Sequence, residues 1–188
     1  MIALPYGNAA GTAGEYKIRP YDLCKEDDMT ETVPSVHFRP ITFKTVVEVC
    51  KLSDTLSPLH HQMVADNAIS IAQAHFSEAA WMRAIYAGDT MVGFIMLHTG
   101  VGYDDRIDCP GVFMWRFMIA GLHQGKGYGR KALETLFEHL RAMGVPEMYT
   151  SCEVGEGSPE GFYRKLGFTP TGKMYGDEIE LIRKIAPR

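Results

Sequence analysis

The sequence predicts a domain of the α+β class, built from β-strands and amphipathic helices around one core. Runs of branched and aromatic residues with little charge are typical of buried strands, and the longest of them covers residues 112–120. Other segments place apolar residues at helical spacing, as in residues 130–141, where the opposite face is charged. A chain of 188 residues is long enough for one substantial core, so we expect no second independent domain.

The N-terminal part of the chain divides into an extension and the first elements of the domain. Residues 1–34 show neither helical nor strand periodicity, and they include the acidic run Glu26-Asp27-Asp28. We expect a weakly ordered N-terminal extension over residues 1–34 and a single domain over residues 35–188. The first elements of that domain are predicted as a strand at residues 36–40 and helices at residues 45–51 and 63–75.

The middle of the chain predicts a hairpin, a long strand and a helix. The hairpin strands are expected at residues 82–87 and 91–98, with Gly88-Asp89 as the central pair of the turn. The long strand at residues 112–120 runs into a glycine-rich loop, and an amphipathic helix follows directly. Gly144 is expected to end that helix.

The C-terminal part predicts a short helix between strands. A strand is expected at residues 148–153. Ser158 and Pro159 suit the cap and the first position of a helix, and Gly167 suits its end. The two final strands are predicted near residues 169–174 and 179–185.

The glycine-rich loop has the properties of an anion-binding site. Gly125, Gly127 and Gly129 let the backbone approach a ligand closely, and unpaired N–H groups at the start of a helix attract an anion such as pyrophosphate. A Walker A loop is excluded because Lys126 is followed by glycine, and a dinucleotide fingerprint is excluded because the glycines alternate. The pattern that fits is Gln/Arg-x-x-Gly-x-Gly/Ala, which begins at Gln124.

A second motif follows one helix and one strand later. It reads Phe-Tyr-x-x-Leu-Gly-Phe and covers residues 162–168. The two motifs resemble the coenzyme A pyrophosphate loop and the second signature of the GNAT superfamily of N-acyltransferases. The resemblance extends over roughly residues 36–185, and two motifs in the right order are far more specific than either alone.

This resemblance implies the GNAT fold, an α/β/α arrangement with a mixed central sheet of about six to seven strands flanked by helices. It also implies acetyl-CoA as the cofactor, with Lys126 and Arg130 adding positive charge near the phosphates. In GNAT relatives the strand before the loop splays away from its neighbour and exposes N–H groups, which here implies Met118 and Ile119. Many relatives carry an asparagine at the start of the last helix, and here Ser158 or a backbone group would replace it. The residues expected to contact acetyl-CoA are Met118, Ile119, Gln124, Gly125, Lys126, Gly127, Tyr128, Gly129, Arg130 and Ser158.

The same resemblance assigns catalytic roles. In GNAT enzymes the tyrosine of the second motif faces the coenzyme sulfur, so Tyr163 is expected to protonate the departing thiolate. A phenol with a pKa of about 10 and a thiol with a pKa of about 8.5 can exchange a proton when they are adjacent. Glu153 is the leading carboxylate for removal of a proton from the amine. Removal by water without a dedicated residue stays equally open, and His98 ranks below Glu153.

The expected acceptor is a small cationic amine. The surroundings of both motifs resemble a subgroup that includes kasugamycin-type aminoglycoside 2′-N-acetyltransferases and bacterial polyamine acetyltransferases. We expect an aminoglycoside first, with acetylation conferring antibiotic resistance, and spermidine or spermine second. The substrate's ammonium groups are expected at Asp104, Asp105 and Glu156. A non-catalytic acyl-CoA sensor is the alternative from another functional class.

Composition and charge argue against several classes of binding partner. The net charge of −4 without a long basic stripe argues against nucleic acid as a partner. No apolar run approaches the roughly 20 residues of a membrane span, and no export signal is evident, so we expect a cytoplasmic protein without a membrane partner. These features are compatible with a homodimer.

The cysteines and histidines are not spaced as metal ligands. The four cysteines are widely separated, which predicts neither a zinc site nor a disulfide framework. The histidines of the first half also lack a ligand motif, so we interpret them as helix-surface residues and expect no metal. They are His60, His61 and His75.

Overall fold

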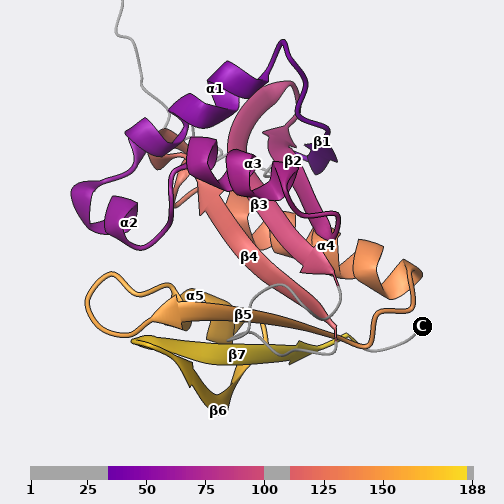
Figure 1. The fold of residues 1–188 in the computed structure, drawn as a ribbon, viewed down its shortest axis with the longest axis vertical. Helices are drawn as coiled ribbons and strands as arrows, with labels where there is room; N and C mark the ends of the chain where they lie inside the picture. The colour runs from indigo at the N-terminus through magenta and orange to yellow at the C-terminus, as the bar shows by residue number, and fades with distance from the viewer. Residues whose placement is uncertain (1–33, 100–110, 186–188) are drawn as a thin grey trace, which may run out of the picture. The chain divides into compact units, whose positions relative to one another are not determined.

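The computed structural model describes residues 34–99 and 111–185, and the central sheet formed by these residues is seven-stranded (Figure 1). Its strands are β1 (Val36–Arg39), β2 (Ala80–Ala87), β3 (Thr90–Thr99), β4 (Val112–Ile119), β5 (Glu147–Glu153), β6 (Thr169–Tyr175) and β7 (Glu178–Lys184). The order across the sheet is β1-β2-β3-β4-β5-β7-β6. Neighbouring strands run antiparallel except for β4 and β5, which are parallel, so the sheet is mixed as expected.

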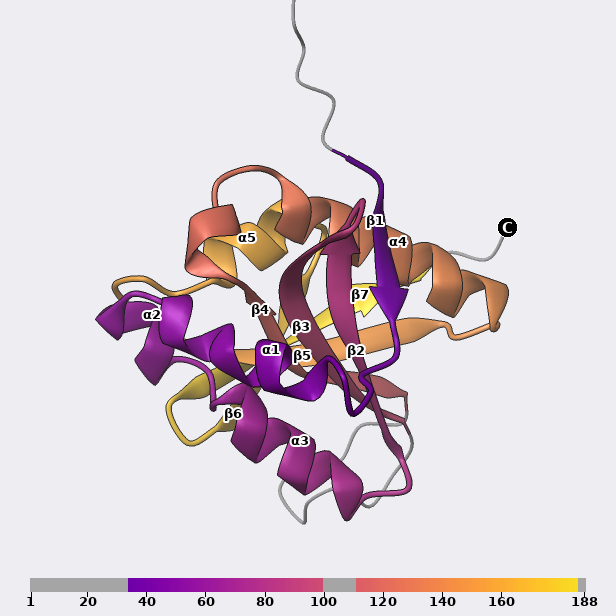
Figure 2. The same ribbon diagram turned by 90° about the horizontal axis from the view of Figure 1, so that it is seen from above.

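Helices cover both faces of this sheet. They are α1 (Val46–Lys51), α2 (Pro58–Gln62), α3 (Asn67–His75), α4 (Tyr128–Ala142) and α5 (Glu160–Lys165). Helices α4 and α5 lie on one face, and α1 and α3 lie on the other (Figure 2). Each face has its own apolar core, which confirms the expected α/β/α layering.

Helix α4 illustrates why the amphipathic segments could be predicted. Its buried residues recur at helical spacing and pack in the core shared with β4 and β5. These residues are Ala132, Leu133, Leu136, Phe137 and Leu140. Gly144 follows the helix with a φ of +75°, the left-handed conformation that commonly ends helices.

The parallel pair β4–β5 is short, and this positions the candidate site. β4 pairs with β5 only from Val112 to Met114, opposite Met148 to Thr150. On its other edge β4 stays paired with β3 as far as Ile119. The second half of β4 therefore has no strand on its β5 side among the described residues, and the two strands diverge.

Two helix predictions need correction. The helix expected at residues 63–75 begins at Asn67, and α2 was not predicted at all. Ser57 caps α2 by accepting a hydrogen bond from the His60 N–H, and Pro58 occupies the first position. The local signal for α2 was therefore present, but it marks a helix too short to show periodicity.

Helix α5 begins one residue later than predicted, at Glu160, with Pro159 as its N-cap residue. The Ser158 hydroxyl still accepts a hydrogen bond from the Glu160 N–H at 3.2 Å, so it satisfies one orphan donor from outside the helix. Part of the sequence prediction lies outside the described residues. It comprises all but the last residue of the extension expected over residues 1–34, together with Asp104 and Asp105.

Candidate active site

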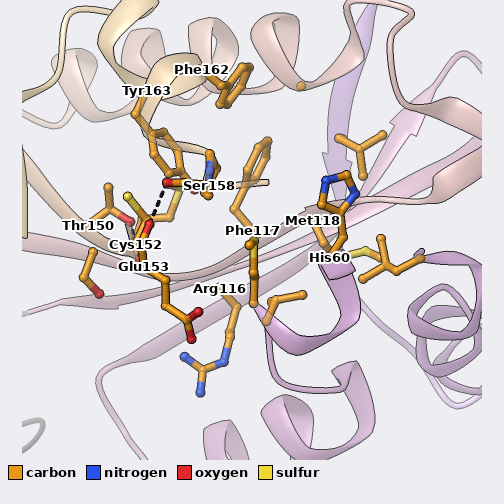
Figure 3. Close-up of a pocket in the computed structure, with 18 of the residues that line it drawn as sticks. His60, Arg116, Phe117, Met118, Thr150, Cys152, Glu153, Ser158, Phe162 and Tyr163 are labelled. Carbon is orange, nitrogen blue, oxygen red and sulfur yellow. Dashed lines mark hydrogen bonds between the residues drawn. The ribbon is translucent and has the colours of Figure 1, made fainter. Parts of the chain in front are cut away.

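A cleft of about 920 Å³ opens where β4 and β5 diverge (Figure 3). Its walls come from both strands, the glycine-rich loop, the start of α5 and the segment around α2. Phe117 of β4 and Phe162 of α5 both line it, with their rings stacked at a centroid distance of 6.2 Å. Two aromatic rings thus form part of the wall of this space on the α5 side.

The glycine-rich loop brings backbone donors to one end of this cleft. Gly127 is the N-cap of α4 with a φ of +81°, and Gly125 has a φ of +75°, a region that favours glycine. Within the described chain, no side chain caps the first turn of α4, so its N–H groups are available to an anion. Gly129 lies in that turn, where an added Cβ would be 3.4 Å from the Phe162 ring.

Three polar side chains of the loop have different surroundings. Gln124 Nε2 donates to the Ile119 carbonyl at 2.9 Å, so one N–H of this amide holds the loop against the end of β4. Lys126 is exposed and lies outside the cleft lining. Arg130 lines the cleft, with its Nη1 at 3.7 Å from Glu134 Oε1. Arg130 is therefore better placed than Lys126 to neutralise a bound anion.

The register of β3 and β4 decides which β4 amides face the cleft. The Ala120 N–H donates to the Val92 carbonyl of β3, and hydrogen-bonding direction alternates along an antiparallel strand. The Met118 amide accordingly faces β3, whereas the amides of Phe117 and Ile119 face the diverging β5. Ile119 therefore remains a candidate amide donor, as expected. The Met118 amide points toward β3 instead of the cleft, contrary to the expectation. The Phe117 amide is a further candidate donor.

Tyr163 lines the cleft although its side chain is almost fully buried. Its ring packs against Phe168 at 5.5 Å between centroids. Burial raises the pKa of the Tyr163 phenol above its usual range; the neighbouring Cys152 adds to this, and the Thr150 hydroxyl opposes it. The phenol is therefore protonated at neutral pH, as a proton donor must be.

Cys152 lies beside Tyr163, and burial raises the pKa of its thiol to about 11. At pH 8 its thiolate fraction should be roughly two orders of magnitude below that of an ordinary thiol. We expect alkylation of Cys152 by iodoacetamide to be slow at pH 8 and to accelerate as the pH rises toward 11. Peptide mass spectrometry can follow it, with the half-exposed Cys50 in the same digest as reference. Alkylation at the rate of free glutathione would contradict this expectation.

The Ser158 side chain is hydrogen-bonded to the backbone of Glu153. The Ser158 hydroxyl donates to the Glu153 carbonyl at 2.6 Å, so this hydroxyl fastens the end of β5 to the start of α5. That hydrogen bond occupies the donor expected to replace the missing asparagine. The Glu153 side chain is exposed and lines the cleft, as a base or an ammonium partner would need to.

The β5–β7 side of the cleft includes residues that sequence reasoning missed. Glu178 lines the cleft directly opposite Glu153 in the β5–β7 register, and its carboxylate accepts a hydrogen bond from Ser151. Glu180, two residues further along β7, is buried, and its carboxylate accepts hydrogen bonds from the Thr171 and Tyr175 hydroxyls. The alternation of acidic residues at the start of β7 is visible in the sequence, but the pairing of that strand with β5 is not.

Other candidates lie elsewhere than expected. Glu156 is exposed and outside the cleft lining, and His98 is buried at the end of β3, also away from the cleft. His60 lines the cleft, which corrects its interpretation as a helix-surface residue. His61 instead pairs with Asp66 at 2.9 Å.

Two searches of the described residues gave negative results. Residues 34–99 and 111–185 contain no group of three or more His, Cys, Asp or Glu side chains arranged to hold a metal ion. In the same part of the chain, no helix is both long and apolar enough to cross a membrane.

Comparisons with solved structures show the fold. An acetyltransferase from Thermus thermophilus superposes with a TM-score of 0.65 over 81% of this chain and 98% of its own, at 19% identity. The PaiA N-acetyltransferase from Thermoplasma acidophilum, solved in complex with coenzyme A, gives a TM-score of 0.53 over 80% of this chain and 99% of its own, at 17% identity. These similarities confirm the GNAT fold.

Sequence comparisons identify the family. The spermine/spermidine N(1)-acetyltransferase of Bacillus subtilis (strain 168) is 29% identical over 102 residues, which are 53% of this chain and 66% of that protein. The match therefore spans just under two thirds of that relative. These comparisons do not support specificity for aminoglycosides. The model of the acetyltransferase (GNAT) family matches residues 49–168, so the chain belongs to this family.

Proposed function

We propose that the protein is an N-acetyltransferase that moves the acetyl group of acetyl-CoA to a primary amine of a small cationic molecule. A linear polyamine such as spermidine or spermine is the favoured acceptor. The observation that carries this proposal is the divergence of β4 from β5 beside the uncapped start of α4, with Tyr163 at the side of the resulting cleft. A cleft between diverging strands suits the extended pantetheine arm of acetyl-CoA, which carries the thioester.

The coenzyme half of the cleft supports the proposal through its donors. The first-turn amides of α4 suit a pyrophosphate, and Arg130 adds a positive charge. The amides of Phe117 and Ile119 suit the carbonyl groups of the pantetheine arm and the thioester oxygen. A positioned donor of that kind is worth about 3–4 kcal/mol of transition-state stabilisation in other enzymes.

The acceptor half supports a cationic substrate. Glu153 and Glu178 face each other across β5 and β7, and like charges directly opposite in a sheet repel. An ammonium group between them would relieve this repulsion. Among the described residues of this half is Arg116, whose Nη1 donates to the Trp115 carbonyl at 2.8 Å and whose guanidinium lies over the Trp115 ring.

The choice between acceptors rests on the relatives. The Bacillus subtilis enzyme is named for spermine and spermidine, which favours a polyamine over the kasugamycin-type aminoglycoside expected first from sequence. A thiol-release assay with acetyl-CoA and separate additions of spermidine, spermine, kasugamycin and short peptides tests this ranking. Turnover with kasugamycin alone would reverse it. Coenzyme A binding without turnover of any amine would favour the sensor.

Glu178→Gln is expected to raise the KM for spermidine roughly threefold to tenfold, because a half-exposed ion pair is worth ~1 kcal/mol. The kcat should change little, since this carboxylate is proposed to bind the substrate only. Steady-state kinetics with saturating acetyl-CoA measure both constants. Asp177→Asn is the matched control, because Asp177 is exposed and lies outside the cleft lining. An unchanged KM in Glu178→Gln would remove Glu178 from the acceptor site.

A further inference from the structure

Two neighbouring histidines of α2 have different surroundings. His61 Nε2 lies 2.9 Å from Asp66 Oδ1, in an exposed pair outside the cleft. His60 is half-buried, and its ring points into the cleft (Figure 3). One turn of helix therefore places one imidazole in the cleft and the other in a surface contact with Asp66.

Helix α2 is capped locally and packs against one other segment. The Ser57 hydroxyl accepts a hydrogen bond from the His60 N–H at 3.3 Å, which caps the start of the helix. Leu59 and Met63 pack on Gly157, where an added Cβ would be 2.6 Å from Leu59 Cδ2 and 3.1 Å from Met63 Cε. This contact joins α2 to the loop between β5 and α5, so the position of His60 relative to the cleft is fixed by packing.

The reaction proposed above needs a proton acceptor in this cleft. An alkylammonium has a pKa of about 10, so it must lose a proton before it can attack a thioester. Burial raises the pKa values of Cys152 and Tyr163, and both groups are protonated at neutral pH. An imidazole is the side chain best suited to accept a proton in this range.

The charges around His60 come from several elements. Arg116 on β4, His123 before the glycine-rich loop and Arg130 on α4 line the same cleft, together with Glu153 and Glu178. On its own segment, the exposed pair of His61 and Asp66 lies outside the cleft lining. The cleft thus contains carboxylates suited to bind the substrate's ammonium group and an imidazole suited to accept its proton.

We propose that His60 is the general base that deprotonates the acceptor amine. The neutral imidazole takes one proton from the ammonium, directly or through one water, and releases it to solvent. The amine nitrogen then forms the C–N bond, and the C–S bond breaks with its electron pair going to sulfur. Tyr163 gives its proton to the thiolate and regains the one that the nitrogen loses on becoming an amide.

This inference rests on the proposed function, and one set of variants tests it. His60→Ala is expected to lower kcat/KM for spermidine at least tenfold at pH 7, because general bases typically contribute about 10²–10⁴. Added imidazole should restore part of the loss. His60→Gln keeps the volume of the side chain and should show the same deficit, whereas His61→Ala should behave as wild type.

The pH profile separates a base from a structural residue. Wild-type kcat/KM should level off well below the pKa of the amine, because the imidazole removes the proton. In His60→Gln it should rise about tenfold per pH unit toward that pKa, about 10. Isothermal titration with coenzyme A should give the same Kd for wild type and variants. An unchanged profile in His60→Gln, or a deficit in His60→Ala that imidazole does not relieve, would overturn the assignment. If wild type acetylates no amine, the proposed function itself fails.

Discussion

Replacing Tyr163 with Phe is expected to lower kcat by about 10²–10⁴, with the Kd for coenzyme A nearly unchanged. The substitution removes one oxygen from a side chain that packs tightly in the core around α4 and α5. Thr150, which interacts with the phenol, keeps its own hydrogen bond to the Met114 carbonyl at 3.1 Å. The variant should therefore fold normally and lose only its proton donor.

The raised pKa of Tyr163 has two consequences that act in opposite directions. It keeps the phenol protonated at every pH at which the enzyme would work, and it makes the phenol a weaker acid. A free phenolate would therefore be costly in this buried position. Transfer to the thiolate becomes feasible when the phenol simultaneously receives the proton that the nitrogen loses.

The measurement compares steady-state turnover with coenzyme A binding for each variant. Tyr149→Phe is the matched control, because the Tyr149 hydroxyl donates to Glu147 Oε1 at 2.6 Å and the residue lies outside the cleft lining. It should retain wild-type kcat. Wild-type kcat in Tyr163→Phe would show that the thiolate obtains its proton elsewhere.

Local sequence was sufficient to predict the strand, glycine-rich loop and helix of the proposed coenzyme site. The strand, loop and helix from Val112 to Ala142 are contiguous, so hydrophobic pattern and glycine spacing together predict the anion site. The short helix carrying Tyr163 was likewise readable from its flanking Ser158 and Gly167, with its start misplaced by one residue. In both cases the physical cause acts over a few residues.

The direction in which the β4 amides point could not be predicted from the sequence. Which amide faces the cleft depends on the pairing of β4 with β3, and that register shifts between Met96 and Leu97. A shift of one residue reverses the direction of every later amide, which explains why Phe117 and not Met118 faces β5.

The residues proposed for the acceptor side could not be predicted together, because they meet only in the folded chain. Glu178 reaches the cleft through the pairing of β7 with β5, and His60 through the contact of α2 with Gly157. Neither contact has a local signature. A helix as short as α2 gives no periodicity from which its cleft-facing side could be read.

Replacing Gly121 with Ala is expected to lower the free energy of unfolding by about 3 kcal/mol and to weaken acetyl-CoA binding. An added Cβ at this position would lie 2.0 Å from the Thr55 carbonyl oxygen. That oxygen belongs to the backbone, so no rotamer change can relieve the overlap. The Gly121 N–H also donates to Thr55 Oγ1 at 2.8 Å, which holds the two segments together at the point of conflict.

The expected loss of binding follows from where Gly121 lies. It begins the turn that leads from the end of β4 into the glycine-rich loop, and Thr55 belongs to the 3₁₀ turn between α1 and α2. Separating these segments should displace both the loop amides and α2. Urea denaturation and isothermal titration with acetyl-CoA measure the two effects.

Gly161→Ala makes the same chemical change in α5, where an added Cβ would have no neighbour within 4 Å. It should be neutral or stabilising by up to about 1 kcal/mol, because alanine favours helix. Equal stability of Gly121→Ala and Gly161→Ala would contradict the close approach at Thr55. A destabilised Gly121→Ala with wild-type affinity would show that the coenzyme loop is independent of α1 and α2.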